Sequence, residues 1–140
     1  MENNPTCLWV VAAALRAADG RWLMQQRPAS KPHGGLWEFP GGKVEAHEMP
    51  HDALVRELHE ELAITLEPSD LIPLTFATAT PGIADRAASG RPVILLYTLN
   101  RWRGLPNSQE GGTARWFARE ALSGLPMPPL DRVLLSALPG

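Results

Sequence analysis

Apolar side chains recur along the chain in short runs separated by turn residues. An apolar run rich in Val and Ala, residues 7–16, and a second strand-like run, residues 21–26, flank Ala18-Asp19-Gly20. An Asp-Gly pair between two such runs predicts a β-hairpin. The other strand-like runs cover residues 37–39, 74–80, 93–102 and 115–117. The pattern therefore predicts a domain that contains several short strands.

One segment has the period of a helix instead. Leu54, Leu58 and Leu62 are four residues apart, so they line one stripe of a helical surface. Pro50 suits the first turn of a helix, where its missing N–H is tolerated, and Pro68 blocks any continuation. The pattern predicts a helix from Pro50 to Leu62, without a side-chain cap at its start.

Weaker helical patterns cover residues 118–122 and 130–138. Strands mixed with helices predict a layered α/β domain. At 140 residues the chain is one domain, residues 1–140, long enough to bury roughly two-thirds of its unfolded surface. The apolar run 8–15 is too short for a membrane span, and no basic leader precedes it, so we expect a cytoplasmic protein without a membrane partner.

The charge balance limits the classes of partner. A net charge of −2 with no basic stripe argues against binding to nucleic-acid polymers, although five Trp leave a base-stacking module as an alternative. Cys7 is the only cysteine, which excludes an internal disulfide and a thiolate zinc cluster. A zinc site built from histidines is an alternative, but Pro50 stands between His47 and His51 and spoils a shared helical face. The four histidines of the chain are His33, His47, His51 and His59.

Acidic side chains gather on the predicted helix. Glu57, Glu60 and Glu61 stand at positions i, i+3 and i+4, so their carboxylates are expected to converge on one face. Carboxylates crowded in this way repel one another, and Mg²⁺ or Mn²⁺ prefers such hard oxygen ligands. The sequence thus indicates a divalent-cation site, with a solvated acidic helix face as the alternative.

The residue order around this helix resembles the signature of the Nudix family of nucleoside-diphosphate-linked hydrolases. The positions in register are Gly42, Glu48, Arg56, Glu57, Leu58, Glu60, Glu61 and Ile64. The resemblance implies a fold in which a mixed β-sheet lies between helices. It also implies Mg²⁺-dependent attack of water on one phosphorus of a pyrophosphate linkage.

The resemblance further implies roles for these residues. It assigns Glu57, Glu60 and Glu61 to the metal, with Glu57 as the general base or its orienting group. A backbone carbonyl of Gly41 or Gly42 is expected as a further ligand, in a tight turn that lets the backbone approach the metal and phosphates.

Three neighbouring side chains have roles implied by the same resemblance. Glu48 is expected at the edge of the metal cluster. Arg56 is expected to orient a catalytic carboxylate, with a surface ion pair to Glu60 as the alternative. Lys43 is expected to meet phosphate or to pair with a motif glutamate.

Within the family, the chain is similar to the MutT branch of 8-oxo-dGTP diphosphatases. This similarity rests on residues 26–28, 35–43 and 127–131. It implies that Arg27 reaches the nucleotide, that Phe39 contacts the base region and that Asp131 binds the base edge. The alternatives are a surface arginine, a core phenylalanine and a helix N-cap aspartate.

A carboxylate at Asp131 would select bases that present N–H donors. Oxidation of guanine at C8 turns N7 into a donor, and the cytosine amine is a donor as well. Hydrolysis of CTP or modified pyrimidine triphosphates, or of a nucleoside diphosphate sugar such as ADP-ribose, therefore remains open. A nucleotide-binding regulator that has lost catalysis is the alternative from another class, and we expect a monomer or homodimer in each case.

The chain departs from the family pattern at three places. Ala63 replaces a Gly that closes the helix in a left-handed conformation, at a cost of about 1 kcal/mol if Ala keeps it. Arg115 stands before Trp116 where MutT relatives carry an acidic metal ligand, so either Glu110 substitutes or the helix binds the metal alone. The long loop 81–92 is expected to reshape the mouth of the pocket.

Overall fold

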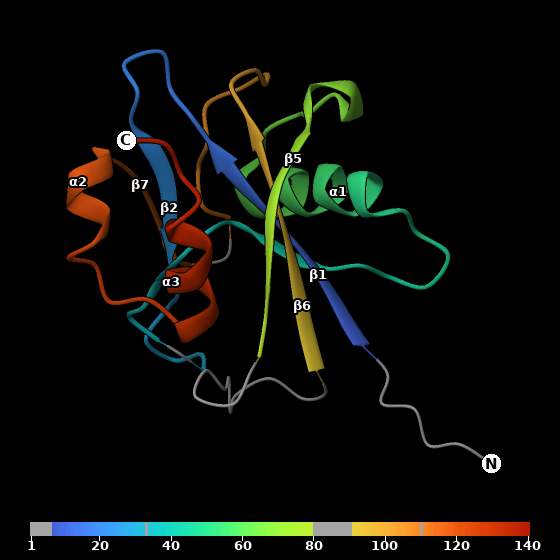
Figure 1. Cartoon of the computed structure of the whole chain (residues 1–140). Coiled ribbons are helices and arrows are strands. Elements are labelled where there is room, and N and C mark those ends of the chain that lie inside the picture. The colour runs from blue at the N-terminus through green and yellow to red at the C-terminus, as the bar shows by residue number, and fades with distance from the viewer. Residues whose placement is uncertain (1–6, 33, 80–90, 110) are drawn as a thin grey trace.

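The protein folds into two β-sheets with helices on both sides of the larger one (Figure 1). The computed structural model describes residues 7–32, 34–79, 91–109 and 111–140. Within these ranges, no helix is long and apolar enough to cross a membrane. The elements are β1 (Cys7–Leu15), β2 (Trp22–Gln26), β3 (Trp37–Glu38), β4 (Gly41–Lys43), α1 (Pro50–Leu62), η1 (Pro68–Asp70), β5 (Ile72–Thr78), β6 (Arg91–Leu99), β7 (Thr113–Phe117), α2 (Arg119–Leu122) and α3 (Pro129–Leu135).

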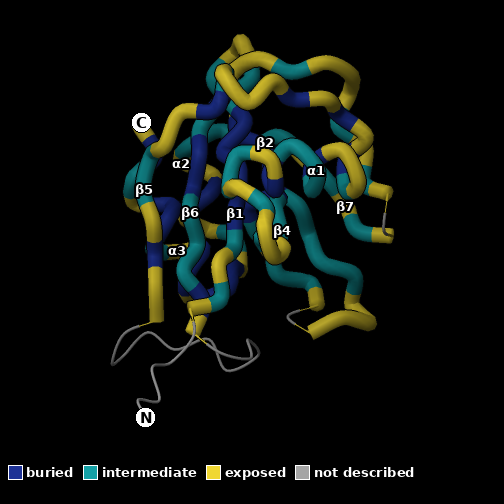
Figure 2. The backbone as a smooth tube through the Cα atoms, turned by 90° about the vertical axis from the view of Figure 1, so that its right-hand side faces the viewer, coloured by how far each residue is buried: buried dark blue, intermediate teal, exposed yellow. Residues whose placement is uncertain are grey.

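The larger sheet is mixed and has the strand order β4-β1-β6-β5. Strand β1 pairs in parallel with β6 and antiparallel with β4, while β5 pairs antiparallel with β6. Side chains alternate along β1: Val11 and Ala13 belong to the core beneath α1, whereas Ala12 and Ala14 belong to the core beneath α3. Buried residues accordingly line the middle of the sheet, and β5 at its edge is largely exposed (Figure 2). The expected sandwich of a mixed sheet between helices is confirmed.

The first two strands do not form the predicted β-hairpin, although the turn between them is present. The turn at Asp19-Gly20 forms, and Arg16 makes a single antiparallel bridge with Trp22. Beyond that bridge the strands separate, because β1 pairs with β6 and β4 whereas β2 joins the smaller sheet, of order β3-β2-β7. Burial of both strands against different partners outweighs the local turn preference.

The two glycines before α1 do not form the expected tight turn. Gly41 and Gly42 lie in β4, paired opposite Ala12 and Val11 of β1, and neither has a positive φ. These glycines therefore allow the backbones of β4 and β1, and the side chain of Glu57, to lie close together.

Helix α1 has the predicted bounds, Pro50–Leu62. Met49 occupies the N-cap position without a side-chain hydrogen bond, as its apolar side chain requires. At the other end Ala63 adopts the left-handed conformation, with φ 57° and ψ 33°, and its N–H bonds to the carbonyl of His59. The helix thus ends as it would with Gly, and Ala63 carries the strain.

Replacing Ala63 with Gly should stabilise the protein by about 1 kcal/mol, because Gly adopts this conformation without a Cβ clash. Such a change raises the melting temperature by roughly 3 °C for a domain of this size. Thermal unfolding of Ala63→Gly against the wild type measures it. The control is Ala46→Gly at an exposed position without a positive φ, which should be neutral or destabilising. An unchanged or lower melting temperature for Ala63→Gly would contradict the prediction.

The remaining predicted elements are present with shifted ends. Strand β5 begins two residues earlier than the run 74–80 indicated, and α3 ends at Leu135. Most of the loop 81–92, with its expected effect on the pocket mouth, lies outside the described residues, as do His33 and Glu110.

Candidate functional site

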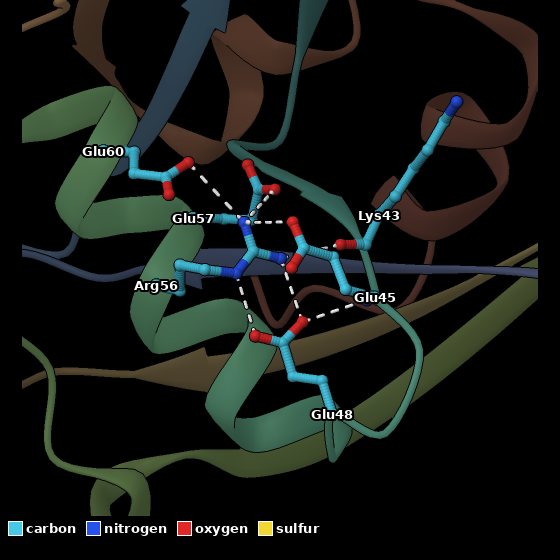
Figure 3. A network of polar contacts seen from close by, with 6 residues as sticks. All are labelled: Lys43, Glu45, Glu48, Arg56, Glu57 and Glu60. Atoms are coloured by element: carbon cyan, nitrogen blue, oxygen red, sulfur yellow. Dashed lines mark hydrogen bonds and ion pairs between the residues drawn. The ribbon is translucent and has the colours of Figure 1, made fainter.

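Arg56 on α1 lies at the centre of an acidic network (Figure 3). Its Nε and Nη2 donate to the two carboxylate oxygens of Glu48, at 2.8 and 2.9 Å. Nη1 donates to Oε1 of Glu57 at 2.8 Å and lies 3.5 Å from Oε2 of Glu60. Nη2 also donates to the backbone carbonyl of Lys43 at 3.0 Å. Arg56 therefore ties α1 to β4 and to the loop between them.

The two alternatives for Arg56 are both present in this network. The bidentate pair is made with Glu48, and a single bond holds Glu57. The i, i+4 contact to Glu60 is longer, and the Glu60 side chain is 54% exposed against 16% for Glu57. A contact of this kind contributes little to stability, so Arg56 acts mainly on Glu48 and Glu57.

Two sets of hydrogen bonds, first those from Arg56 and second that from the backbone N–H of Glu45, lower the pKa of Glu48 from an ordinary value of 4.5 to about 2. The Glu45 N–H donates to the Glu48 carboxylate at 3.0 Å. In turn, the bond to Glu48 and the contact with Glu57 raise the pKa of Arg56. Glu48 and Arg56 therefore both stay charged across the whole physiological range.

This pKa shift predicts an acid-sensitive contribution to stability. Because the folded-state pKa of Glu48 lies below 4.5, its contribution is present above pH 4.5 and is lost as the pH falls towards about 2. Glu48→Gln should therefore be less stable than the wild type at pH 7, and the difference should shrink between pH 4.5 and 2. Urea unfolding across this range in metal-free buffer measures it, with Glu120→Gln as charge-matched control. A difference independent of pH would contradict the assignment.

The motif glutamates differ in their surroundings. The Glu57 carboxylate lies against Gly42, where an added Cβ would be 2.3 Å from its carboxyl carbon. Glu61 lines a cavity, and Glu60 faces solvent. Within the described residues, no three His, Cys, Asp or Glu side chains form a group that could hold a metal, so the expected convergence of the three carboxylates is not seen. Arg56 instead is the counter-ion of Glu48 and Glu57, with a longer contact to Glu60.

A cavity of about 340 Å³ lies beside the network, between the larger sheet and the start of α3. It has an apolar wall from β1 and β6 and polar groups at its edges. Its lining includes Leu8, Val10, Ala12, Arg27, Glu38, Phe39, Gly41, Gly42, Lys43, Glu61, Ile94 and Asp131. The cavity thus brings Glu61 together with every residue expected to bind substrate. Glu57 is not a lining residue, but its carboxylate lies against Gly42, which is one.

Asp131 is held inside this cavity by backbone. Its Oδ2 accepts the N–H of Phe39 at 3.0 Å, and the residue is only 7% exposed. It is not the helix N-cap, since Pro128 takes that position and Asp131 lies in the first turn of α3. The N-cap alternative is therefore wrong. Phe39 is itself buried, so it belongs to the core and to the cavity wall at once.

Arg27 and Lys43 supply positive charge to the cavity. Nε of Arg27 donates to Oε1 of Glu38 at 2.9 Å, and Nη1 donates to the carbonyl of Pro32 at 2.8 Å. The Lys43 side chain extends away from the glutamates around Arg56, which favours the phosphate alternative over a pair with a motif glutamate (Figure 3).

Sequence reasoning missed Glu38, which holds Arg27. The pairing of strands β2 and β3 could have indicated this contact. Glu38 pairs with Gln25, and Gln25 stands two residues before Arg27. Arg115 is exposed on β7 opposite Met24. The rings of His51 and Tyr97 are in tilted contact, with centroids 5.1 Å apart and planes at 54°.

Known proteins resemble the chain over most of its length. A family model described as NUDIX domain matches residues 8–138. A CTP pyrophosphohydrolase of Escherichia coli is 38% identical, with 91% of this chain and 88% of that protein covered. An 8-oxo-dGTP diphosphatase of Haemophilus influenzae is 32% identical, with 92% and 89% covered.

The fold agrees with these relatives. The solution structure of the E. coli ORF135 protein has a TM-score of 0.78 at 31% identity and covers 95% of this chain and 89% of that chain. The crystal structure of MutT NUDIX hydrolase from Burkholderia pseudomallei has a TM-score of 0.79 at 27% identity, with 96% and 99% covered. The chain therefore belongs to the NUDIX domain family and is a hydrolase that acts on phosphoric anhydrides.

Proposed function

We propose that this hydrolase cleaves a nucleoside triphosphate to the monophosphate and pyrophosphate, and that its substrate is 8-oxo-dGTP. One observation carries the proposal: a single cavity is lined by Glu61 of the motif at one place and by the buried Asp131 at another. A nucleotide in this cavity would present its phosphates to the motif glutamates and its base to an acceptor that prefers N–H donors.

Nudix hydrolases generally use divalent metal ions. The carboxylates of α1 are the hard oxygen donors that Mg²⁺ prefers, and they would have to draw together around the ion, because they do not converge without it. Glu57 and Glu61 offer carboxylate oxygens beside the cavity border, and Glu60 is one turn away from Glu57 on α1. We assign the metal to these three glutamates and to a backbone carbonyl of Gly41 or Gly42. When bound, the cation would neutralise phosphate oxygens and lower the pKa of a water.

The protein side chains then have separate tasks. Glu57 accepts the proton of the attacking water as the new P–O bond forms, while the bond to the leaving phosphate oxygen breaks. Arg56 holds the Glu57 carboxylate through its 2.8 Å bond, and Glu48 holds the Arg56 guanidinium. Arg27 and Lys43 neutralise phosphate charge at the cavity edge.

CTP or a modified pyrimidine triphosphate is the second candidate substrate. A relative that is 38% identical over 130 residues is named CTP pyrophosphohydrolase, whereas relatives named 8-oxo-dGTP diphosphatase are 32% and 28% identical over a similar length and 40% identical over a shorter stretch of 65 residues. The cytosine amine offers Asp131 an N–H donor just as N7–H of 8-oxoguanine does. Asp131 alone does not separate these two bases.

The test is the specificity constant, kcat/KM, with Mg²⁺ for 8-oxo-dGTP, dGTP, CTP, 5-methyl-dCTP and ADP-ribose. We expect 8-oxo-dGTP to exceed dGTP by about 100-fold or more, since a buried acceptor rejects a base that lacks the donor. A maximum on CTP, 5-methyl-dCTP or ADP-ribose would replace the proposed substrate and keep the reaction. Absence of turnover on all five would instead favour a nucleotide-binding regulator.

Asp131→Asn tests the base contact without deleting it. The amide oxygen can still accept the Phe39 N–H, while the other position becomes a donor that opposes the N–H of the base. We expect kcat/KM for the preferred substrate to fall between about 10-fold and 100-fold with little change in melting temperature. An equal fall for dGTP and 8-oxo-dGTP would show that Asp131 does not discriminate between the bases.

A further inference from the structure

The segment of residues 103–109, between β6 and β7, is hydrogen-bonded to the end of α1 through its backbone. Arg103 and Thr65 exchange two backbone bonds of 3.0 Å, just beyond the helix. The N–H of Asn107 donates to the carbonyl of Leu62 at 3.0 Å, and that of Gln109 donates to the carbonyl of Glu61 at 2.8 Å. The last turn of α1 is therefore bound to residues more than forty positions later in the chain.

These bonds matter because the last carbonyls of a helix have no donors within the helix. At α1 the local cap supplies only the bond from Ala63 to His59, at 3.1 Å. The carbonyls of Glu61 and Leu62 are taken by segment 103–109 instead. The position of the final helical turn thus depends on this segment as well as on the helix.

The segment is itself fixed at both ends. Before it, Trp102 stacks on Trp116 of β7, with ring centroids 5.7 Å apart and planes at 22°. After it, Gly112 lies so close to the Gln26 carbonyl that an added Cβ would be 2.6 Å away. Because Gln26 directly precedes Arg27, a residue of the cavity lining, the chain that follows the segment lies close to the cavity as well.

We propose that segment 103–109 is a positioning element for Glu61, and that the backbone N–H of Gln109 is its decisive contact. The inference rests on the proposed function in one respect, namely that Glu61 is a metal ligand. Hydrogen bonds to the ligating groups of a metal site orient them, and losing one weakens metal binding by about 10-fold to 100-fold. We infer that the bond to the Glu61 backbone acts in the same way, because it fixes the point from which the Glu61 side chain reaches the cation. The Gln109 side chain is not the contact, because it donates to the carbonyl of Asn107 at 2.7 Å.

Two variants at one position separate the N–H from the side chain. Gln109→Pro deletes the N–H, and Gln109→Ala keeps it. Binding of Mn²⁺ to the nucleotide-free protein is followed by the electron paramagnetic resonance signal of the free ion, and a melting curve is recorded for each variant. We expect Gln109→Pro to raise the Mn²⁺ dissociation constant by at least about 10-fold and Gln109→Ala to match the wild type. Equal affinity in all three proteins, or a lower melting temperature of Gln109→Pro at unchanged affinity, overturns the proposal.

A second measurement needs no variant, in case Gln109→Pro does not fold. If the segment positions a metal ligand, then by linkage the metal must stabilise the segment in return. Amide hydrogen exchange of Gln109 and Asn107 should therefore slow when Mg²⁺ is added to the wild type, whereas exchange at exposed Arg21 should stay constant. Unchanged exchange at Gln109 overturns the proposal.

The outcomes distinguish this inference from the proposed function. Substrate turnover enters neither measurement, so wild type that hydrolyses none of the nucleotides can still support the positioning role through Mn²⁺ binding and amide exchange. Wild type that hydrolyses nucleotides, with Mn²⁺ affinity unchanged in Gln109→Pro, retains the function and loses the positioning role. Wild type that binds no Mn²⁺ at all overturns the positioning role.

Discussion

Glu57→Gln should lower kcat by about 10³-fold with Mg²⁺, because the amide cannot accept the proton of the attacking water and is a poor metal ligand. We assign the general base to Glu57 because it is the motif glutamate that Arg56 holds by a hydrogen bond. Its carboxylate lies against Gly42 at the cavity border and is held by Arg56 at 2.8 Å, whereas Glu60 is largely exposed. Steady-state kinetics on the preferred substrate of the panel measure the effect.

The matched control is Glu120→Gln, which removes the same charge from an exposed position on α2. This variant should keep wild-type kcat. Glu57→Gln should also keep a nearly wild-type melting temperature, because the amide oxygen still accepts the bond from Arg56. If Glu57→Gln retained more than about a tenth of the wild-type kcat, the general base would have to be another group.

The sequence predicted best those features that local interactions determine. Helix α1 has the expected bounds because Pro50 fits its first turn and Leu54, Leu58 and Leu62 share one buried stripe. The left-handed conformation at position 63 was also predictable, because the motif spacing ends the helix there whichever residue occupies the position. The mixed sheet between helices was predictable through the family resemblance, since the strand order could not be derived from periodicity.

The features that escaped prediction depend on contacts between distant segments. Asp131 and Phe39 are 92 positions apart, so nothing near Asp131 distinguished a carboxylate that binds a strand N–H from a helix cap. The hairpin prediction was wrong because β6, a distant strand, pairs with β1. Arg56 bonds to Glu57 and lies 3.5 Å from Glu60, and spacing along one helix does not determine this choice of partner for the glutamates.

The glycine pair of β4 shows how the fold and the site meet, and it gives a sharp comparison of two neighbouring substitutions. A Cβ on Gly41 would be 1.9 Å from the backbone oxygen of Val11 and 2.7 Å from Cα of Ala12. A Cβ on Gly42 would instead meet the end of the Glu57 side chain, 2.3 Å from its carboxyl carbon. The first obstacle is the backbone of the paired strand, and the second is a flexible side chain that can rotate away.

Gly42→Ala should therefore fold normally and lose activity. The Ala methyl group forces the Glu57 carboxylate away from its bond to Arg56, and a catalytic group displaced by about 1 Å can lower kcat by about 100-fold. The expected fall in stability is small, about 1 kcal/mol, because only one side chain must move. Steady-state kinetics and urea unfolding of the same preparation separate the two quantities.

Gly41→Ala should mainly lose stability, whereas Gly42→Ala should mainly lose activity. Because the Cβ of Gly41→Ala clashes with backbone, β4 must separate from β1, and we expect stability to fall by about 3 kcal/mol. Whatever protein remains folded should keep Glu57 bonded to Arg56, so kcat per folded molecule should fall less than in Gly42→Ala. If Gly42→Ala were as active as the wild type, Glu57 would act from a position other than the one described, and its assignment as general base would have to be abandoned.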